Sequence, residues 1–542
     1  MPHGRREIFN LLVHRINSFS EGYRQNIALL GEPCIGKTSL VKQLLNSEDI
    51  KKETVIPIYI EIKIEPFEFC AKRFIKSAIF ELLHSDPLAA QSYDAVVLID
   101  DLKRQYPKTA ETCYRVLRDI EKGRFDEAYS YMLDIPAAIR EESKKRCLLI
   151  MDEFHNLENF TLKHAFGILA KKIMIQKDTM FLLISSKNTL SQRLLAEKLY
   201  LLFGNFEKIF MPSFDIGMSR VFLQDILKDI PLPKAYIDFI ASFTGNKPFY
   251  MQVVCDEIEK AVFSGKVNRN DYPALIERAL TESIFKKTGV INNFFSTTFF
   301  KISDGKLLSR SAAALIALSS ENKKQHEIAK AAKLQARDCS RILNRLVEMD
   351  IIVRNGSLCR FRERLFAFWL KSVYMKRIMS FSIDEGIEEN YFRKEVACHL
   401  NEFMLDFEKE LFSKITDLFK LFKNDVIQLN GKRHKFISFN SIERIEEDLC
   451  NGASFMAASG RLNWLCTIKR DPVTESDISS IINKTKKKEI KARINRNIII
   501  ALAGINENAY LMAKDARFWI WDLDSINVLM ELYGKSHFID IT

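Results

Sequence analysis

The chain has 542 residues, of which 47% are hydrophobic and 28% charged, a composition typical of a soluble globular protein with about three or four domains. The sequence has no apolar run long enough to cross a bilayer, no signal-peptide core and no C-x-x-C pair among its ten cysteines, which argues against membrane-spanning, secreted and zinc-ribbon classes and predicts a cytoplasmic protein. The net charge of +11 is concentrated in residues 301–380, where 17 Lys/Arg face 7 Asp/Glu, a difference of +10 that is typical of a polyanion-binding segment.

The first chemical motif follows a predicted strand. Residues 26–30 are apolar, residues 31–38 fit G-x-x-x-x-G-K-[ST], and residues 39–45 continue at helical spacing. Glycines let backbone N–H groups turn toward a phosphate, and the helix N-terminus adds a partial positive charge, whereas a chance glycine-rich turn would lack this strand and helix. We therefore predict that ATP binds to Gly31, Glu32, Pro33, Cys34, Ile35, Gly36, Lys37, Thr38 and Ser39. Lys37 would reach the β- and γ-phosphates, and the Thr38 hydroxyl would ligate Mg²⁺.

The second motif is a buried strand that ends in two carboxylates. Residues 55–62 predict an earlier strand, and residues 67–84 and 90–143 a helical insertion without recognisable chemistry. The apolar residues 147–151 then lead to Asp152 and Glu153. After a phosphate loop, Asp152 is expected to hold Mg²⁺. Glu153 is expected to act as general base toward the attacking water.

A third apolar strand, residues 180–184, ends in two hydroxyl side chains. Ser185 or Ser186 would sense the γ-phosphate or position the water, but a serine that caps a core strand explains the pattern equally well. Both interpretations stay open at this point.

These motifs, with the start at residues 4–7 and the turns at residues 210–214 and 245–248, occur in an order that resembles archaeal-type AAA+/STAND P-loop ATPases. The resemblance covers roughly residues 4–375 and implies an α/β core over residues 1–215, a helical lid over 216–300 and a winged helix-turn-helix over 301–380. It also implies that Pro248 lies against the nucleotide. The family often carries an arginine after a Leu-Phe/Tyr-Gly step, but Asn205 stands there, which predicts slow hydrolysis or a residue supplied from elsewhere.

The basic middle segment predicts three helices, at residues 311–318, 325–332 and 336–349, and a β-hairpin over 351–361 that turns at Asn-Gly. One face of the third helix is apolar and the other is basic. A DNA-binding interpretation assigns groove contacts to Arg337, Arg341, Asn344 and Arg345, and phosphate contacts on the hairpin to Arg354 and Arg360. The alternative is a packing or protein-contact module.

Residues 381–542 predict a C-terminal α/β domain: a long helix over 388–423, strands at 434–439, 453–458, 462–469, 497–502 and 517–521, and helices at 476–496, 506–514 and 525–533. The order is similar to the PD-(D/E)xK nuclease-like domain appended to many such ATPases. Thr467 stands where that motif needs an acid, and Glu446, Glu447 and Asp448 come too early, so cleavage is not expected. The basic run from Lys484 to Arg496 is either a solvated face or a contact for nucleic acid or an acidic partner.

The sequence therefore predicts an ATPase that uses Mg²⁺ and couples its nucleotide state to binding of double-stranded DNA. The alternative is a slow nucleotide-gated switch or scaffold that recruits a protein partner or another copy of itself and has no role on DNA. No membrane partner is expected.

Overall fold

The computed structural model describes most of the chain, namely residues 4–51, 53–83, 94–199, 206–303, 308–320, 323–379, 385–445, 452–460, 462–485 and 494–535. The chain forms two compact units. Unit 1 contains Met1–Phe222 together with two short later segments, Lys247–Phe249 and Glu348–Asp350, and unit 2 contains the rest.

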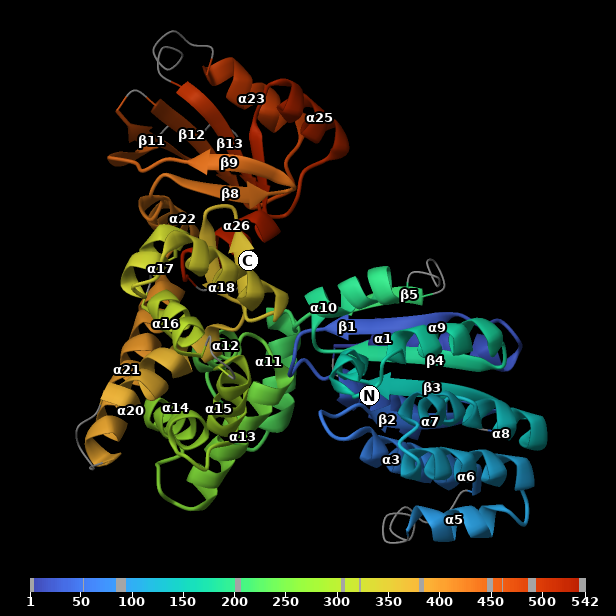
Figure 1. The fold of residues 1–542 in the computed structure, drawn as a ribbon. Helices are drawn as coiled ribbons and strands as arrows, with labels where there is room; N and C mark the ends of the chain where they lie inside the picture. The colour runs from blue at the N-terminus through green and yellow to red at the C-terminus, as the bar shows by residue number, and fades with distance from the viewer. Residues whose placement is uncertain are drawn as a thin grey trace. The chain divides into compact units, whose positions relative to one another are not determined.

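Unit 1 is built on a parallel sheet of five strands in the order β2-β3-β4-β1-β5 (Figure 1). The strands are β1 (Asn26–Gly31), β2 (Val55–Glu61), β3 (Arg146–Asp152), β4 (Thr179–Ser185) and β5 (Phe206–Met211). The register pairs Leu30 with both Ser185 of β4 and Phe210 of β5, so the carboxyl ends of these strands meet at one edge. Because both faces are covered by helices, β1, β3 and β4 are almost continuously apolar, as the sequence predicts for a buried parallel sheet.

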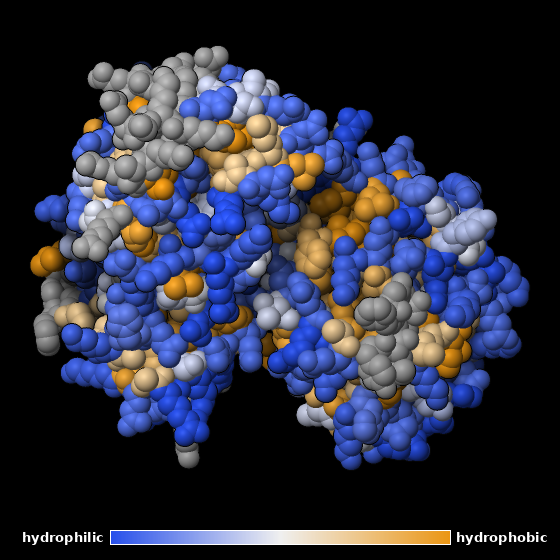
Figure 2. Space-filling model, turned by 90° about the horizontal axis from the view of Figure 1, so that it is seen from above, coloured by the Kyte–Doolittle hydropathy of each residue, from blue (hydrophilic) through white to orange (hydrophobic). Residues whose placement is uncertain are grey.

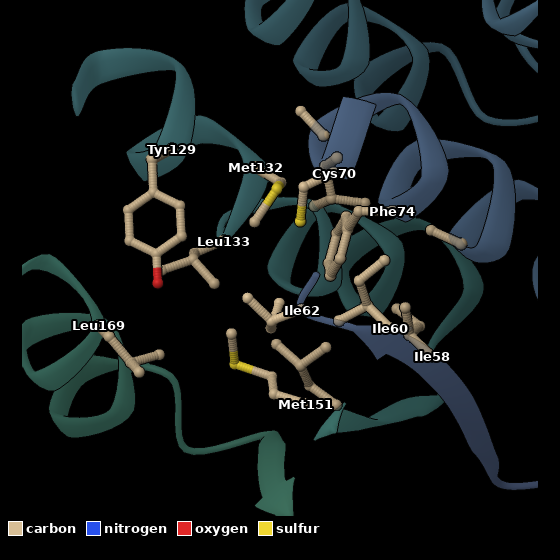
Figure 3. Packing of buried hydrophobic residues seen from close by; sticks show 14 of the residues in the cluster. Ile58, Ile60, Ile62, Cys70, Phe74, Tyr129, Met132, Leu133, Met151 and Leu169 are labelled. Carbon is tan, nitrogen blue, oxygen red and sulfur yellow. The ribbon is translucent and has the colours of Figure 1, made fainter. Parts of the chain in front are cut away.

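Helices cover the two faces of this sheet and form two hydrophobic cores. The helices are α1 (Arg6–Ser20), α2 (Lys37–Asn46), α3 (Phe67–Leu83), α5 (Ala95–Leu102), α6 (Pro107–Glu121), α7 (Phe125–Met132), α8 (Ile135–Ser143), α9 (Ala165–Ile175), α10 (Asn188–Arg193) and α11 (Ile216–Ile226), the last of which runs into unit 2. Successive residues of β2 face opposite cores: Ile58 and Ile60 pack toward Phe74 of α3 (Figure 3), whereas Tyr59 between them packs against the other core. The predicted helical insertion is therefore confirmed as a layer that covers this face.

The first part of unit 2 is helical and ends in a two-stranded hairpin. The helices are α12 (Lys234–Phe243), α13 (Pro248–Phe263), α14 (Tyr272–Leu280), α15 (Val290–Ser303), α16 (Leu308–Ser319), α17 (Gln325–Ala331), α18 (Ala336–Glu348), α19 (Arg364–Trp369) and α20 (Met375–Met379). The strands β6 (Ile352–Asn355) and β7 (Leu358–Phe361) pair antiparallel. The three helices and the hairpin predicted in the basic segment are thus present, with boundaries within three residues of the expected ones.

The C-terminal part of unit 2 contains a mixed sheet in the order β10-β11-β12-β13-β14 and a separate β8–β9 hairpin. The elements are α21 (Glu385–Glu408), α22 (Leu411–Lys420), β8 (Asp425–Leu429), β9 (Lys432–Phe436), β10 (Ser441–Ile445), β11 (Ala453–Ser459), β12 (Leu462–Lys469), α23 (Glu475–Thr485), β13 (Ile494–Ala501), α25 (Glu507–Asp515), β14 (Trp519–Asp522) and α26 (Leu523–Leu532). One sheet face packs on α22, α26 and the β8–β9 hairpin, and the other on α23 and α25.

Three predictions for this part were wrong. The helix expected over 388–423 is two helices, because the backbone is extended at Glu410 and Lys409 bonds to Asp406 and Asp417 across the break. The strands β8 and β10 were missed, although the turn between β8 and β9 is Asn430-Gly431, with both residues in the left-handed region. Residues 494–496 belong to β13 and not to the basic helix.

No described helix has the length and apolarity needed to cross a membrane. Hydrophilic residues cover most of the face shown in Figure 2, with hydrophobic residues gathered in smaller groups.

Candidate nucleotide site and basic surface

The loop between β1 and α2 has the backbone shape that phosphate binding needs. Gly36 (φ +91°) precedes the first residue of α2, and Cys34 is also left-handed (φ +67°). Gly31 has no room for a side chain, because a Cβ there would lie 2.4 Å from Ile35 Cδ1 and 2.7 Å from the carbonyl oxygen of Met211. The loop therefore turns tightly and delivers its following N–H groups at the start of a helix.

Lys37 lies inside this loop. Its Nζ donates to the carbonyl oxygens of Gly31 at 2.9 Å and Glu32 at 2.7 Å, and only 5% of the residue is exposed. Burial lowers the pKa of Lys37, an effect that the carboxylates of Glu153 and Asp152 oppose. A buried cation that exchanges backbone carbonyls for phosphate oxygens gains charge-assisted hydrogen bonds, which suits the predicted role.

Thr38 and Asp152 come together although 114 residues separate them. The Thr38 hydroxyl donates to Asp152 Oδ2 at 2.6 Å, and the Tyr59 hydroxyl donates to the same oxygen at 3.0 Å. The backbone N–H of Glu153 donates to the other carboxylate oxygen at 2.9 Å. Converging hydroxyl and carboxylate oxygens fit Mg²⁺, which takes few protein ligands and completes its shell with phosphates and water.

Glu153 is held by the end of the neighbouring strand β4. Its Oε2 accepts from the backbone N–H of Ser186 at 3.0 Å and from the Ser186 hydroxyl at 2.8 Å. Burial raises the pKa of Glu153, while the bonds from Ser186 and the charge of Lys37 act in the opposite direction. Ser186, and not Ser185, is therefore the hydroxyl that contacts this carboxylate.

Ser185 points into the interior instead. Its hydroxyl lies 2.8 Å from His155 Nδ1 and accepts from Ser191 Oγ at 2.6 Å. His155 Nδ1 is also 3.2 Å from Glu153 Oε2, and burial, with the charges of Lys187 and Lys37, lowers the pKa of His155 to about 4, so the ring is neutral at pH 7. Ser185 and His155 thus form a buried polar layer behind Glu153.

A later segment of unit 1, Lys247–Phe249, contributes Pro248 to the neighbourhood of the loop. The Phe249 N–H donates to the carbonyl oxygen of Cys34 at 3.3 Å, and Lys247 Nζ lies 3.0 Å from Glu32 Oε2 with only 4% of Lys247 exposed. Pro248 is the first residue of α13. The segment brings a second buried cation beside the phosphate loop.

Sequence reasoning missed Tyr59, His155 and Lys247. Tyr59 sits two residues before the end of β2, whose other residues before Glu61 are apolar, and His155 lies two residues after the predicted base, so both were detectable as polar side chains near strand ends. Lys247 adjoins the predicted Pro248, but its distance from the phosphate loop along the chain hides the contact with Glu32.

The basic face of α18 is exposed as the spacing predicts. Arg337, Arg341, Asn344 and Arg345 are exposed, whereas Cys339, Ile342, Leu343 and Leu346 are buried. The hairpin arginines are placed differently. Arg354 is exposed and donates to Gln325 Oε1 at 3.2 Å, whereas Arg360 forms an ion pair with Glu531 of α26.

In the C-terminal sheet, Thr467, which stands at the predicted acid position, is bonded to a second hydroxyl. Ser454 of β11 donates to Thr467 of β12 at 3.2 Å, and both are buried. Lys469 is paired with Asp477 of α23, and both side chains are more than 90% buried. Among the described residues no cluster of three or more His, Cys, Asp or Glu side chains could hold a metal ion. Residues 446–448, 486–493 and 202–205 lie outside the described residues.

No protein-family model and no curated protein matches this chain. Solved structures are similar to it. A Walker-type ATPase of Pyrococcus abyssi has 16% identity, covers 68% of this chain and 95% of its own, and has a TM-score of 0.46. The ORC2 protein of Aeropyrum pernix, with ADPNP and ADP, has 15% identity, covers 73% of this chain and 95% of its own, and has a TM-score of 0.44. The ORC1 protein of Aeropyrum pernix in complex with DNA has 14% identity, covers 68% of this chain and 92% of its own, and has a TM-score of 0.39.

Proposed function

We propose that the protein is an AAA+-like ATPase that uses Mg²⁺ and couples its nucleotide state to double-stranded DNA bound by a winged helix in unit 2. The observation that carries the ATPase part is the convergence of Lys37, Thr38, Asp152 and Glu153 at one edge of a parallel sheet. Bound Mg²⁺ would neutralise charge on the phosphates. Lys37 and the loop N–H groups would bind the phosphates, Thr38 and Asp152 would hold the ion, and Glu153 would accept a proton from the attacking water.

The bonds from Ser186 make Glu153 a weaker base than a free carboxylate, so full activity requires that these bonds be released. Both donors of Ser186 are directed at Glu153 Oε2. A γ-phosphate would offer the Ser186 hydroxyl a charged acceptor and so release Glu153 to the water. This requirement also favours the second candidate, a slow nucleotide-gated switch that recruits a protein partner or another copy of the chain.

The DNA part rests on α18. Three guanidinium groups, those of Arg337, Arg341 and Arg345, lie on its exposed face at helical spacing, and the apolar stripe is buried. An exposed basic helix that follows two shorter helices and precedes a hairpin is the arrangement in which a recognition helix enters the major groove.

Coupling is supported by the short segment that follows α18. Asp350 accepts from the Thr189 N–H at 3.0 Å and from its hydroxyl at 2.6 Å, and Lys187 Nζ donates to the carbonyl oxygen of Met349 at 2.9 Å. Residues 187–189 directly follow Ser186. Hydrogen bonds inside unit 1 therefore connect the residues after β4 to the end of the proposed recognition helix.

The deciding experiment is ATP turnover by the wild type and by Glu153→Gln, each with and without duplex DNA at low salt. Turnover that rises with DNA and is lost in the variant supports a DNA-coupled ATPase. Background turnover in both, with ATP binding retained, supports the switch instead. The variant Arg341→Ala/Arg345→Ala should weaken DNA binding and flatten the dependence of log affinity on log salt, and unchanged affinity would refute groove binding by α18.

A further inference from the structure

The tip of the β6–β7 hairpin is occupied by a strand of the C-terminal part of unit 2. Asn355 Nδ2 donates to the carbonyl oxygen of Gln428 at 3.0 Å, and Asn355 Oδ1 accepts from the Gln428 N–H at 2.6 Å. Ser357 makes the matching bonds to Val426: its hydroxyl accepts from the Val426 N–H at 3.0 Å, and its own N–H donates to the Val426 carbonyl at 2.8 Å. A Cβ on Gly356 would lie 2.0 Å from that same carbonyl oxygen. The hairpin tip is therefore committed to β8.

The strand paired with β8, β9, carries a concentration of positive charge. β9 reads Lys432-Arg433-His434-Lys435-Phe436, and its three Lys and Arg side chains are all exposed. The antiparallel register places Arg433 opposite Gln428 and Lys435 opposite Val426, so these two cations share the outward face with the residues that bind the hairpin tip. β8 lies between the hairpin tip and β9, and neighbouring strands are about 5 Å apart, so β9 is one strand spacing beyond the strand that the tip contacts.

On the other face of β9, a neutral histidine and one further cation, Arg496, lie beside an aromatic ring. His434 packs edge-on against Trp519 with ring centroids 4.5 Å apart, and the Arg496 guanidinium lies 4.7 Å from the centre of the same ring. Burial, with the charges of Arg496 and Lys432, lowers the pKa of His434. Among the described residues, Lys432, Arg433, Lys435 and Arg496 form no ion pair with a carboxylate.

We propose that β9 is a phosphate-binding strand that takes the place of the hairpin tip, so that duplex DNA held at α18 also contacts Arg433 and Lys435. The proposal rests on the proposed function, because it assumes that DNA binds this part of unit 2. Uncompensated cations on an exposed strand attract the backbone of any duplex and release its counterions, so the contact stabilises binding without reading sequence. An acidic protein surface is the competing partner, and the salt dependence with DNA distinguishes the two.

The test is a salt titration of duplex affinity by fluorescence anisotropy with Arg433→Gln/Lys435→Gln. The matched control is Lys266→Gln/Arg269→Gln, which removes the same charge from exposed positions of the loop between α13 and α14 in the same unit. Loss of two phosphate contacts should reduce the slope of log affinity against log salt by about 1.8. Between 50 and 200 mM KCl, the ratio of wild-type affinity to the affinity of the Arg433→Gln/Lys435→Gln variant should therefore shrink about twelvefold.

If the Arg433→Gln/Lys435→Gln variant and the control variant reduce the salt slope equally, the proposal is overturned, because the reduction would then reflect net charge alone. If Arg341→Ala/Arg345→Ala flattens the slope while Arg433→Gln/Lys435→Gln does not, the further inference fails and the proposed function stands. If the wild type binds no duplex at all, both fail. Unchanged tryptophan fluorescence of the variants would show that unit 2 is still folded, since all four tryptophans lie there.

Discussion

The junction between the β6–β7 hairpin and β8 makes a quantitative prediction at Gly356. Alanine there meets two separate obstacles: the left-handed backbone (φ +59°) and the Val426 carbonyl 2.0 Å from the new Cβ. Because the obstructing atom is backbone, the hairpin tip must move away from β8. The first obstacle costs roughly 1–2 kcal/mol for any residue other than glycine.

The second obstacle costs the hydrogen bonds of the junction. Asn355 makes two of them with Gln428, and Ser357 makes three with Val426. Because the side-chain bonds are solvent-exposed, each of the five is worth about 0.5 kcal/mol, so their loss adds about 2.5 kcal/mol. Gly356→Ala should therefore destabilise unit 2 by about 4 kcal/mol.

Gly460 supplies a matched control within the same unit. Its φ is +57°, nearly that of Gly356, but a Cβ there would meet nothing within 4 Å. Gly460→Ala should therefore cost only the backbone contribution of roughly 1–2 kcal/mol. Urea unfolding followed by tryptophan fluorescence measures both variants, because every tryptophan lies in unit 2. Equal losses of stability in the two variants would refute the reasoning, since the junction bonds would then contribute nothing.

Three further predictions concern single side chains. Tyr59→Phe removes a donor from Asp152 and should raise the Mg²⁺ concentration needed for nucleotide binding by about tenfold, measured with a fluorescent ATP analogue; an unchanged requirement would contradict the Mg²⁺ assignment. Lys37→Ala should abolish the increase in melting temperature that ATP gives the wild type, and a retained increase would place the phosphates elsewhere. Asp477→Ala leaves Lys469 buried without its partner and should destabilise unit 2 by about 3–5 kcal/mol in urea unfolding. Although burial opposes it, bonding from Lys469 holds the pKa of Asp477 below its usual 3.8, so this stability is present above about pH 4 and should be lost as the pH falls further. A loss of stability in acid that is the same in the variant would refute this assignment.

Much of the candidate nucleotide site was predictable because its parts depend on short-range patterns. The phosphate loop is eight consecutive residues, and the acids of β3 follow an apolar run directly. Parallel strands end at one edge of a sheet, so Thr38 and Asp152 had to approach each other once both strands were recognised. The boundaries of α16, α17 and α18 followed from the helical period in the same way.

The choice between Ser185 and Ser186 could not be made from sequence. Successive residues of a strand point to opposite sides, so only one of the two could meet Glu153, but the pattern does not say which. In the folded chain the Ser185 hydroxyl is hydrogen-bonded to the buried His155, and the Ser186 hydroxyl donates to Glu153.

The helix period predicts a single helix over residues 388–423, where the chain forms α21 and α22. The apolar stripe continues through Leu411 and Phe412, and neither glycine nor proline marks the break at Glu410. The Asn430-Gly431 turn lies between that predicted helix and the strand predicted at 434–439, and it was local evidence for the β8–β9 hairpin that the prediction did not use.

The proposed link between nucleotide and DNA depends on contacts that no local pattern predicts. Asp350 is only 8% exposed and has a left-handed backbone (φ +59°), so its two bonds to Thr189 are fixed in direction. The Lys187 N–H is in turn bonded to Ser185, one residue before the hydroxyl that holds Glu153. A movement of Ser186 toward a γ-phosphate would therefore pull on a chain of hydrogen bonds that ends two residues after α18. We infer that a DNA-induced change at α18 would act on Glu153 along the same route, since coupling between two bound ligands is reciprocal.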